Sequence, residues 1–236
     1  MGLGMIDVAA VTDRATPGIR RVLLGAWILR SSLGETGRAN SCAPIGDPGA
    51  DLGDAVDTVE RWYAERDRPT IFQLFDDTDV AVRHELDRRG YRSGAVTDVL
   101  TCPISDLRVG GGDVAVEVTA DMPDLLAEQL RPARAEEMLS TTQPRWFAVA
   151  SVDGEPVGAG MGVGDGDLVG VFAMRTRPDQ QGRGAGQAVL DALVAEGGRR
   201  GATTAWLQVE MGNDRAGDWY RRLGFTRISG YRYRAR

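Results

Sequence analysis

The stretch "RPDQQGRGAG" (177–186) ends with a glutamine, an arginine and three glycines within six positions, after a strand-like pattern (168–176) and directly before the helical pattern "QAVLDALVAEGGRR" (187–200). A glycine-dense turn that opens into a helix is typical of two structures. It is either a plain loop or a set of backbone N–H groups that bind an anion, because the first N–H groups of a helix have no intrahelical partner. The glycines do not follow the G-x-G-x-x-G spacing, which disfavours a dinucleotide-binding fold.

The composition indicates a chain that buries a core. Its 236 residues, 42% of them hydrophobic, suffice for one large domain or two small ones. The net charge of -6 argues against a nucleic-acid partner, which normally requires a basic field, and weakly favours a cationic amine as substrate.

Several chemistries are excluded because their residues are missing. All 28 basic residues are arginines, so a P-loop lysine and a Schiff-base lysine are absent. One histidine, His84, and two cysteines, Cys42 and Cys102, are too scattered for a zinc site, and we expect no metal. A disulfide is possible, but free thiols are the default. No apolar run is long enough to span a membrane and the first residues do not resemble a signal peptide, so we expect a cytoplasmic protein without a membrane partner.

The clearest seam in the chain is the proline and glycine-rich stretch at 103–112. It predicts two domains, 1–106 and 113–236. In the first we expect strands at 25–32, 37–44, 70–75 and 91–102, with helices at 51–66 and 79–90. In the second we expect a strand at 113–119, a helix at 123–140 broken at Pro132, three strands within 145–176 with tight turns at 153–154 and 165–167, helices at 184–199 and 214–224, a strand at 203–210 and a final strand or pair after 225.

A short segment of the first part is similar in sequence to a segment of the second. "HELDRRGY" (84–91) and "DWYRRLGF" (218–225) each end a helical pattern with arginines, a glycine and an aromatic residue. If Gly90 matches Gly224, Leu86 stands where the second segment has Tyr220. Two related domains in tandem would explain this similarity. Coincidence would also explain it, because glycine is a common helix terminator.

Two motifs in the second part resemble those of the GNAT superfamily of acyl-CoA N-acyltransferases. Gln181-x-x-Gly184-x-Gly186 resembles its Gln/Arg-x-x-Gly-x-Gly/Ala signature, and "LQVEMGNDRAGDWYRRLGF" (207–225) is similar to its fifth strand, the asparagine after it and the next helix. The resemblance covers 113–236 and implies an α+β fold with a mostly antiparallel sheet whose fourth and fifth strands splay apart. The first part resembles, more loosely, the degenerate first half of a tandem branch of that superfamily.

The resemblance implies acetyl-CoA as co-substrate. Main-chain groups of Met174 and Thr176 would pair with its pantetheine arm, and the backbone at the glycine-rich bend would hold its diphosphate. The cofactor-binding residues implied at the bend and at the next helix are Gln181, Gly182, Arg183, Gly184, Ala185, Gly186, Asn213 and Ala216.

The implied reaction is direct attack of a primary amine on the acetyl thioester. Tyr220 matches the family's tyrosine, and its hydroxyl would protonate the leaving thiolate. The alternative is that Tyr220 is an aromatic residue of the core without a catalytic role. Glu210, at the end of the fifth strand, is the candidate base, and an exposed strand-end carboxylate is the competing interpretation. The turn "TGRANS" (36–41) either lines a substrate groove between the two parts or is a structural turn.

The same motifs fit two further kinds of protein. One binds acyl-CoA without catalysis, and the other is a transferase that uses a longer acyl chain. The acceptor is a small amine, an amino acid, an antibiotic or a protein amine, and the chain is a monomer or a homodimer.

Overall fold

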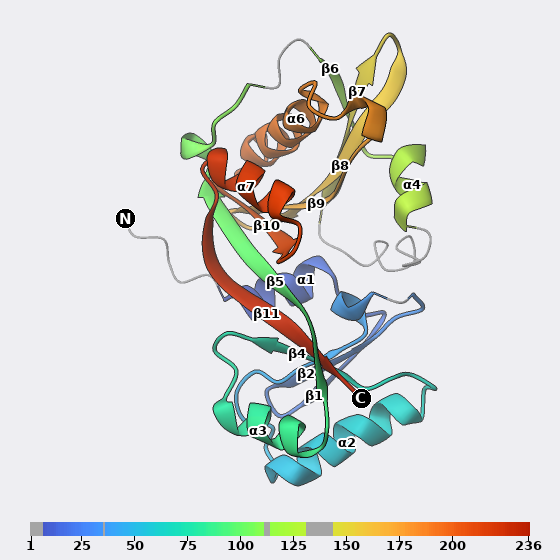
Figure 1. Ribbon diagram of the computed structural model, residues 1–236, viewed down its shortest axis with the longest axis vertical. Coiled ribbons are helices and arrows are strands. Elements are labelled where there is room, and N and C mark those ends of the chain that lie inside the picture. The colour runs from blue at the N-terminus through green and yellow to red at the C-terminus, as the bar shows by residue number, and fades with distance from the viewer. Residues whose placement is uncertain (1–6, 35, 111–113, 131–143) are drawn as a thin grey trace.

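The computed structural model describes residues 7–34, 36–110, 114–130 and 144–236 (Figure 1). Its strands form one mixed 11-stranded sheet in the order β1-β2-β3-β4-β11-β5-β10-β9-β8-β7-β6. The fold is α+β, as predicted. The elements are α1 (Val8–Ala15), β1 (Arg20–Leu24), β2 (Trp27–Ser31), the 3-10 turn η1 (Gly37–Ala39), β3 (Cys42–Ala43), α2 (Leu52–Ala64), β4 (Ile71–Phe75), α3 (Val80–Arg88), β5 (Arg92–Pro103), η2 (Ile104–Asp106), β6 (Ala115–Thr119), α4 (Asp124–Leu130), β7 (Arg145–Val152), β8 (Glu155–Asp165), β9 (Leu168–Thr176), η4 (Pro178–Gln180), α6 (Ala185–Arg199), β10 (Thr204–Glu210), α7 (Asp214–Arg222) and β11 (Thr226–Ala235).

The two halves of the chain share the centre of this sheet. Strand β11, the last in the chain, lies between β4 and β5 of the first half and is antiparallel to both. The other edge of β5 pairs with β10 of the second half, so the sheet is continuous across the predicted domain boundary. The structure therefore has a single sheet, and the division into 1–106 and 113–236 stays a prediction.

Most predicted elements are present within a few residues of their expected bounds. The strand expected at 37–44 is shorter, since only Cys42–Ala43 pairs with β2 and residues 37–39 form a 3-10 turn. The side chain of Asn40 stabilises this turn, because its Oδ1 accepts from the Ser32 N–H at 2.7 Å and its Nδ2 donates to the Gly34 carbonyl at 2.9 Å. The part of the expected helix beyond residue 130 lies outside the described residues. The sequence analysis missed α1 and β1.

Helices cover both faces of the sheet (Figure 1). Helices α6 and α7 pack over β7 to β10 in one core, and α2 and α3 pack over β2 to β4 in another. The third core lies on the opposite face, where α1 and α4 contact residues of β8, β9, β10 and β11. The two faces of β10 therefore belong to different cores. Because side chains alternate along a strand, successive residues of β10 point into different cores.

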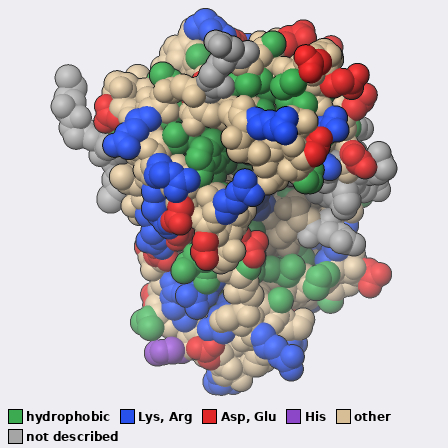
Figure 2. Space-filling view, turned by 45° about the horizontal axis from the view of Figure 1, so that its top comes forward, with side chains coloured by type: hydrophobic (Ala, Val, Ile, Leu, Met, Phe, Trp, Pro, Cys, Tyr) green, Lys and Arg blue, Asp and Glu red, His purple; other side chains and the backbone are tan. Residues whose placement is uncertain are grey.

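Ion pairs connect the two halves. Arg227 of β11 contacts Asp98 of β5 at 2.7 Å and Asp76 at 2.6 Å, and Arg14 of α1 contacts Asp165 at 2.8 Å. Figure 2 shows arginine and acidic side chains interspersed over the visible face. An exposed pair such as Arg227–Asp76 contributes at most about 1 kcal/mol, so the shared sheet and its cores carry most of the stability.

The glycines of β8 make room for large neighbours. A Cβ atom on Gly162 would lie 2.5 Å from the indole of Trp146, which is buried and donates from Nε1 to the Leu193 carbonyl at 3.1 Å. We expect Gly162→Ala to lower the free energy of unfolding by about 1–3 kcal/mol through overpacking. Urea denaturation measures this. Gly198→Ala in α6 is the control, since its Cβ meets nothing within 4 Å; equal stability of both variants would contradict the prediction.

Candidate active site

A slot opens where β9 and β10 separate. Their parallel ladder pairs residues 168–171 with 204–207 and then ends. Beyond it β9 continues to Thr176 beside β8, and β10 continues to Glu210 beside β5. A register shift between β8 and β9 and the positive φ of Ala173 (51°) mark a bulge at the point of separation. A bulge bends a strand, so it directs β9 away from β10.

The free edge of β9 offers main-chain groups to this slot. The N–H of Arg177 donates to the Val157 carbonyl of β8 at 2.8 Å. Because successive residues of a strand direct their hydrogen-bonding groups to opposite edges, the N–H and C=O of Met174 and Thr176 point away from β8. These are the residues that the sequence analysis assigns to the pantetheine arm.

The slot leads to the N-terminus of α6. Gly184 is the N-cap residue with a φ of 89°, and Gly182 has a φ of 78°, a left-handed conformation that favours glycine. No side chain caps the helix and no acidic residue lies in its first turn. The first intrahelical bond joins the Ala188 N–H to the Gly184 carbonyl, so the preceding amides are available to an anion.

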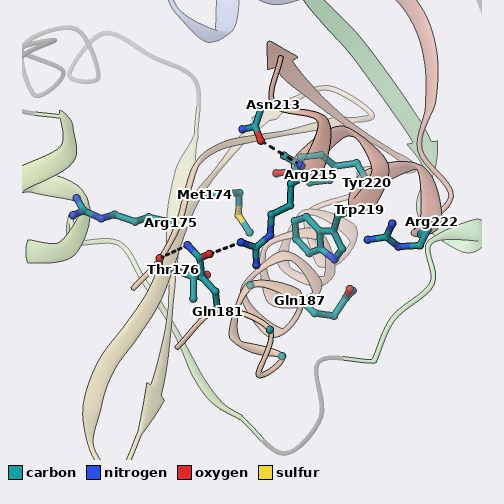
Figure 3. Close-up of a pocket in the computed structure, with 14 residues that line it drawn as sticks. Met174, Arg175, Thr176, Gln181, Gln187, Asn213, Arg215, Trp219, Tyr220 and Arg222 are labelled. Carbon is teal, nitrogen blue, oxygen red and sulfur yellow. Dashed lines mark hydrogen bonds between the residues drawn. The ribbon is translucent and has the colours of Figure 1, made fainter. Parts of the chain in front are cut away.

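A cleft of about 510 Å³ connects the bend, the strand edge and α7 (Figure 3). Of the residues proposed from the sequence, nine line it: Met174, Thr176, Gln181, Gly182, Gly184, Gly186, Asn213, Ala216 and Tyr220. Arg183, Ala185 and Glu210 are not among its lining residues. The cleft is also lined by five residues that sequence reasoning missed, namely Arg175, Gln187, Arg215, Trp219 and Arg222.

Tyr220 is held by the packing of α7. It is 7% exposed, its ring lies 5.7 Å from that of Phe225 and 4.7 Å from that of Trp219, and burial raises the pKa of its hydroxyl to about 12. The structure gives this hydroxyl no hydrogen bond to another described residue. It is therefore protonated at neutral pH and free to donate into the cleft.

Hydrogen bonds join three residues that line the cleft (Figure 3). Arg215 of α7 donates from Nη1 to Oε1 of Gln181 at 2.7 Å, and Nε2 of Gln181 donates to the Thr176 carbonyl at 3.5 Å. These bonds fix the glutamine of the glycine-rich bend beside the free edge of β9. They also bring a cation close to the uncapped helix terminus, where it favours an anionic ligand.

Asn213 and Glu210, which the sequence analysis assigns to the cofactor and to catalysis, lie at the two ends of the turn between β10 and α7. The side chain of Asn213 is the N-cap of α7, accepting from the Ala216 N–H at 3.3 Å, and this leaves its Nδ2 for a ligand. Glu210 is exposed at the end of β10, opposite Thr97 of β5. Their roles toward ligands stay predictions.

The remaining candidates of the sequence analysis lie outside this cleft. Cys42 and Cys102 are free and buried, and burial raises the pKa of both thiols, which makes them poor nucleophiles. Within the described ranges, no three acidic, histidine or cysteine side chains could hold a metal ion. No helix of the described part of the chain is long and apolar enough to cross a membrane.

The splayed strand pair and the glycine-rich bend at a helix N-terminus are the arrangement of the GNAT fold. A solved structure with the same fold is a GCN5-related N-acetyltransferase from Kribbella flavida, with a TM-score of 0.70 and 21% identity over 98% of this chain and 96% of that one. Another, a tandem GNAT protein from the clavulanic acid biosynthesis pathway, has a TM-score of 0.63 and 10% identity over 97% of this chain and 86% of that one.

The chain belongs to the family described as "Probable histone acetyltransferase Rv0428c C-terminal", which matches residues 5–234. It is 29% identical over 208 residues, 83% of its length, to "Probable histone acetyltransferase Rv0428c" of Mycobacterium tuberculosis. The chain spans 62% of the length of that relative.

Proposed function

We propose that this chain transfers an acetyl group from acetyl-CoA to a primary amine by direct attack. The observation that carries the proposal is the continuous path from the uncapped amides of α6, along the free edge of β9, to the hydroxyl of Tyr220. Amides that can bind an anion lie at one end of this path, and a proton donor lies at the other. This arrangement suits acetyl-CoA, a long thioester that carries a diphosphate.

Each end of this path has a separate task. Acetyl-CoA supplies an activated acetyl thioester. The amides at 181–186 and Arg215 would hold the diphosphate, and the backbone of Met174 and Thr176 would hold the arm. As the amine nitrogen bonds to the carbonyl carbon and the C–S bond breaks, the Tyr220 hydroxyl would give its proton to the sulfur. Glu210, directly or through water, would take the proton that the amine loses.

We further propose that the first half is a degenerate repeat of the second. Each half contains three strands, a helix, a strand, a helix and a strand in this order, and β3 is parallel to β4 as β9 is to β10. The ends of α3 and α7 also match, because the Tyr91 N–H donates to the Leu86 carbonyl at 3.0 Å and the Phe225 N–H to the Tyr220 carbonyl at 3.1 Å.

The first repeat would bind no acetyl-CoA. The helix that corresponds to α6 is α2, and its N-terminus is capped by the carboxylate of Asp51 and has Asp54 in its first turn. Negative charge and an occupied cap disfavour a diphosphate there. Leu86 replaces the tyrosine.

The proposed function predicts binding and turnover that can be measured separately. Calorimetry should detect acetyl-CoA binding to the full chain, and a thiol assay should detect release of coenzyme A when a suitable amine is present. Binding without turnover across a panel of amines would favour a non-catalytic acyl-CoA-binding protein. Absence of acyl-CoA binding would overturn the proposed function.

A further inference from the structure

A polar cluster lies on the face of the sheet opposite α6 and α7, beside the slot. Ala205, Leu207 and Val209 of β10 pack in the core of α6 and α7, whereas Trp206 packs in the opposite core. Gln208 and Glu210 share the face of Trp206, because side chains alternate along a strand. Gln208 is also the first residue of β10 beyond its last ladder pair with β9.

The first half of the chain reaches this position through Arg38. The Nε atom of Arg38 donates to the hydroxyl of Tyr231 at 3.2 Å, and this hydroxyl donates to Oε1 of Gln208 at 2.7 Å. The "TGRANS" turn that carries Arg38 is fixed by Asn40, and a Cβ on Gly37 would lie 3.0 Å from the ring of Tyr233. The arginine is thus held against β11 by a packed turn.

The cluster contains more donors than it uses. The Nε2 atom of Gln208 is buried and has no hydrogen-bond partner among the described residues. Buried polar groups are nearly always satisfied, so an unpaired donor just past the end of the β9–β10 ladder indicates a missing acceptor atom.

The charge of Arg38 is likewise not neutralised by a contact. No carboxylate of the described ranges makes an ion pair with its guanidinium. Burial alone would lower the pKa of Arg38, whereas the neighbouring Tyr231, Tyr233 and Glu210 raise it. The guanidinium is therefore charged, and it suits a carboxylate in particular, because its planar donors match two oxygens.

We infer that the acceptor amine is a 2-amino carboxylate, a free amino acid, whose carboxylate contacts Arg38 and Gln208 and whose amino group lies toward Glu210 and the slot. This inference rests on the proposed function. A diamine fits less well, because its second ammonium group would meet the cation of Arg38. A peptide N-terminus would offer only a neutral carbonyl oxygen to the same donors.

Calorimetry on the full chain, saturated with coenzyme A, tests the inference without requiring turnover. The twenty amino acids are titrated first. The tightest binder is then compared with its carboxamide and with the amine that lacks its carboxylate. We expect the carboxylate to bind about 10–100-fold more tightly than the decarboxylated amine, as hydrogen bonds to charged groups provide.

Variants assign the effect to the cluster. Arg38→Gln should lower the affinity for the amino acid by about 10–100-fold and leave the affinity for coenzyme A unchanged. Arg20→Gln, at an exposed residue of β1, is the matched control and should change neither. If Arg38→Gln does not fold, Gln208→Glu serves as the second variant, since its carboxylate should repel the ligand and reverse the preference toward the decarboxylated amine.

The outcomes separate the two proposals. Binding of no amino acid, equal binding of carboxylate and carboxamide, or loss of amino acid and decarboxylated amine alike in Arg38→Gln would overturn the inference. Failure of coenzyme A to bind would overturn the proposed function, and titration of the amino acids into the protein alone would still test the Arg38 cluster.

Discussion

Replacement of Tyr220 by phenylalanine is expected to lower kcat by about 10²–10⁴-fold, the contribution of a positioned general acid. The substitution removes only the hydroxyl, which makes no hydrogen bond to a described residue, and it keeps the ring contacts with Trp219 and Phe225. The affinity for acetyl-CoA and the stability should therefore change little. Thiol release measures kcat, and calorimetry measures the affinity.

The pH dependence gives this prediction a sign. A general acid must be protonated, so its contribution is present below its pKa and lost as the pH rises through it. Burial raises the pKa of Tyr220 to about 12, above the usual value near 10. The rate should thus rise with pH as the amine, with a pKa near ~10, deprotonates, without a decline from tyrosine ionisation in that range.

A matched control is available in the first half. Tyr91→Phe removes a hydroxyl that donates to Glu60 at 2.9 Å, far from the cleft in the fold, and should leave kcat unchanged. Turnover of Tyr220→Phe equal to that of the unmodified protein would remove Tyr220 from the mechanism. An equal loss in both variants would indicate a general effect on the fold.

Local patterns predicted the parts of the site that depend on neighbouring residues. The bend at 177–186 and the start of α6 follow from glycine and helix periodicity, which act over a few positions. The alignment of Gly90 with Gly224 likewise gives two helix ends with the same hydrogen bonds.

The remaining features of the fold and of the site depend on contacts between residues far apart in the sequence. Patterns of neighbouring residues do not predict such contacts. The insertion of β11 between β4 and β5 depends on pairing across the whole chain, and Arg38 meets Tyr231 over a separation of 193 residues. The missed lining residues Arg215, Trp219 and Arg222 lie on α7, where the faces that meet the cleft depend on packing against β10 and α6. The N-terminus of α6 has no side-chain cap, whereas the N-terminus of α2 is capped by Asp51.

Replacement of Gly186 by aspartate is expected to weaken acetyl-CoA binding by about 100-fold or more. Gly186 lies in the first turn of α6 and lines the cleft, and a Cβ there would lie 3.3 Å from Oγ1 of Thr176. A carboxylate would compete for the free amides and repel the diphosphate, and two like charges about 4 Å apart cost on the order of 1–4 kcal/mol.

The folded state should tolerate this change. Gly186 does not require a left-handed conformation, and aspartate in the first turn of a helix is stabilising by about 0.3–1 kcal/mol. Gly198→Asp adds the same charge at the other end of α6, where a Cβ meets nothing within 4 Å, and should keep its affinity for acetyl-CoA. Calorimetry on both variants, with unfolding curves beside it, measures the difference. Because the proposed reaction depends on an anion held by these amides, a folded Gly186→Asp variant that binds acetyl-CoA normally would show that the diphosphate lies elsewhere.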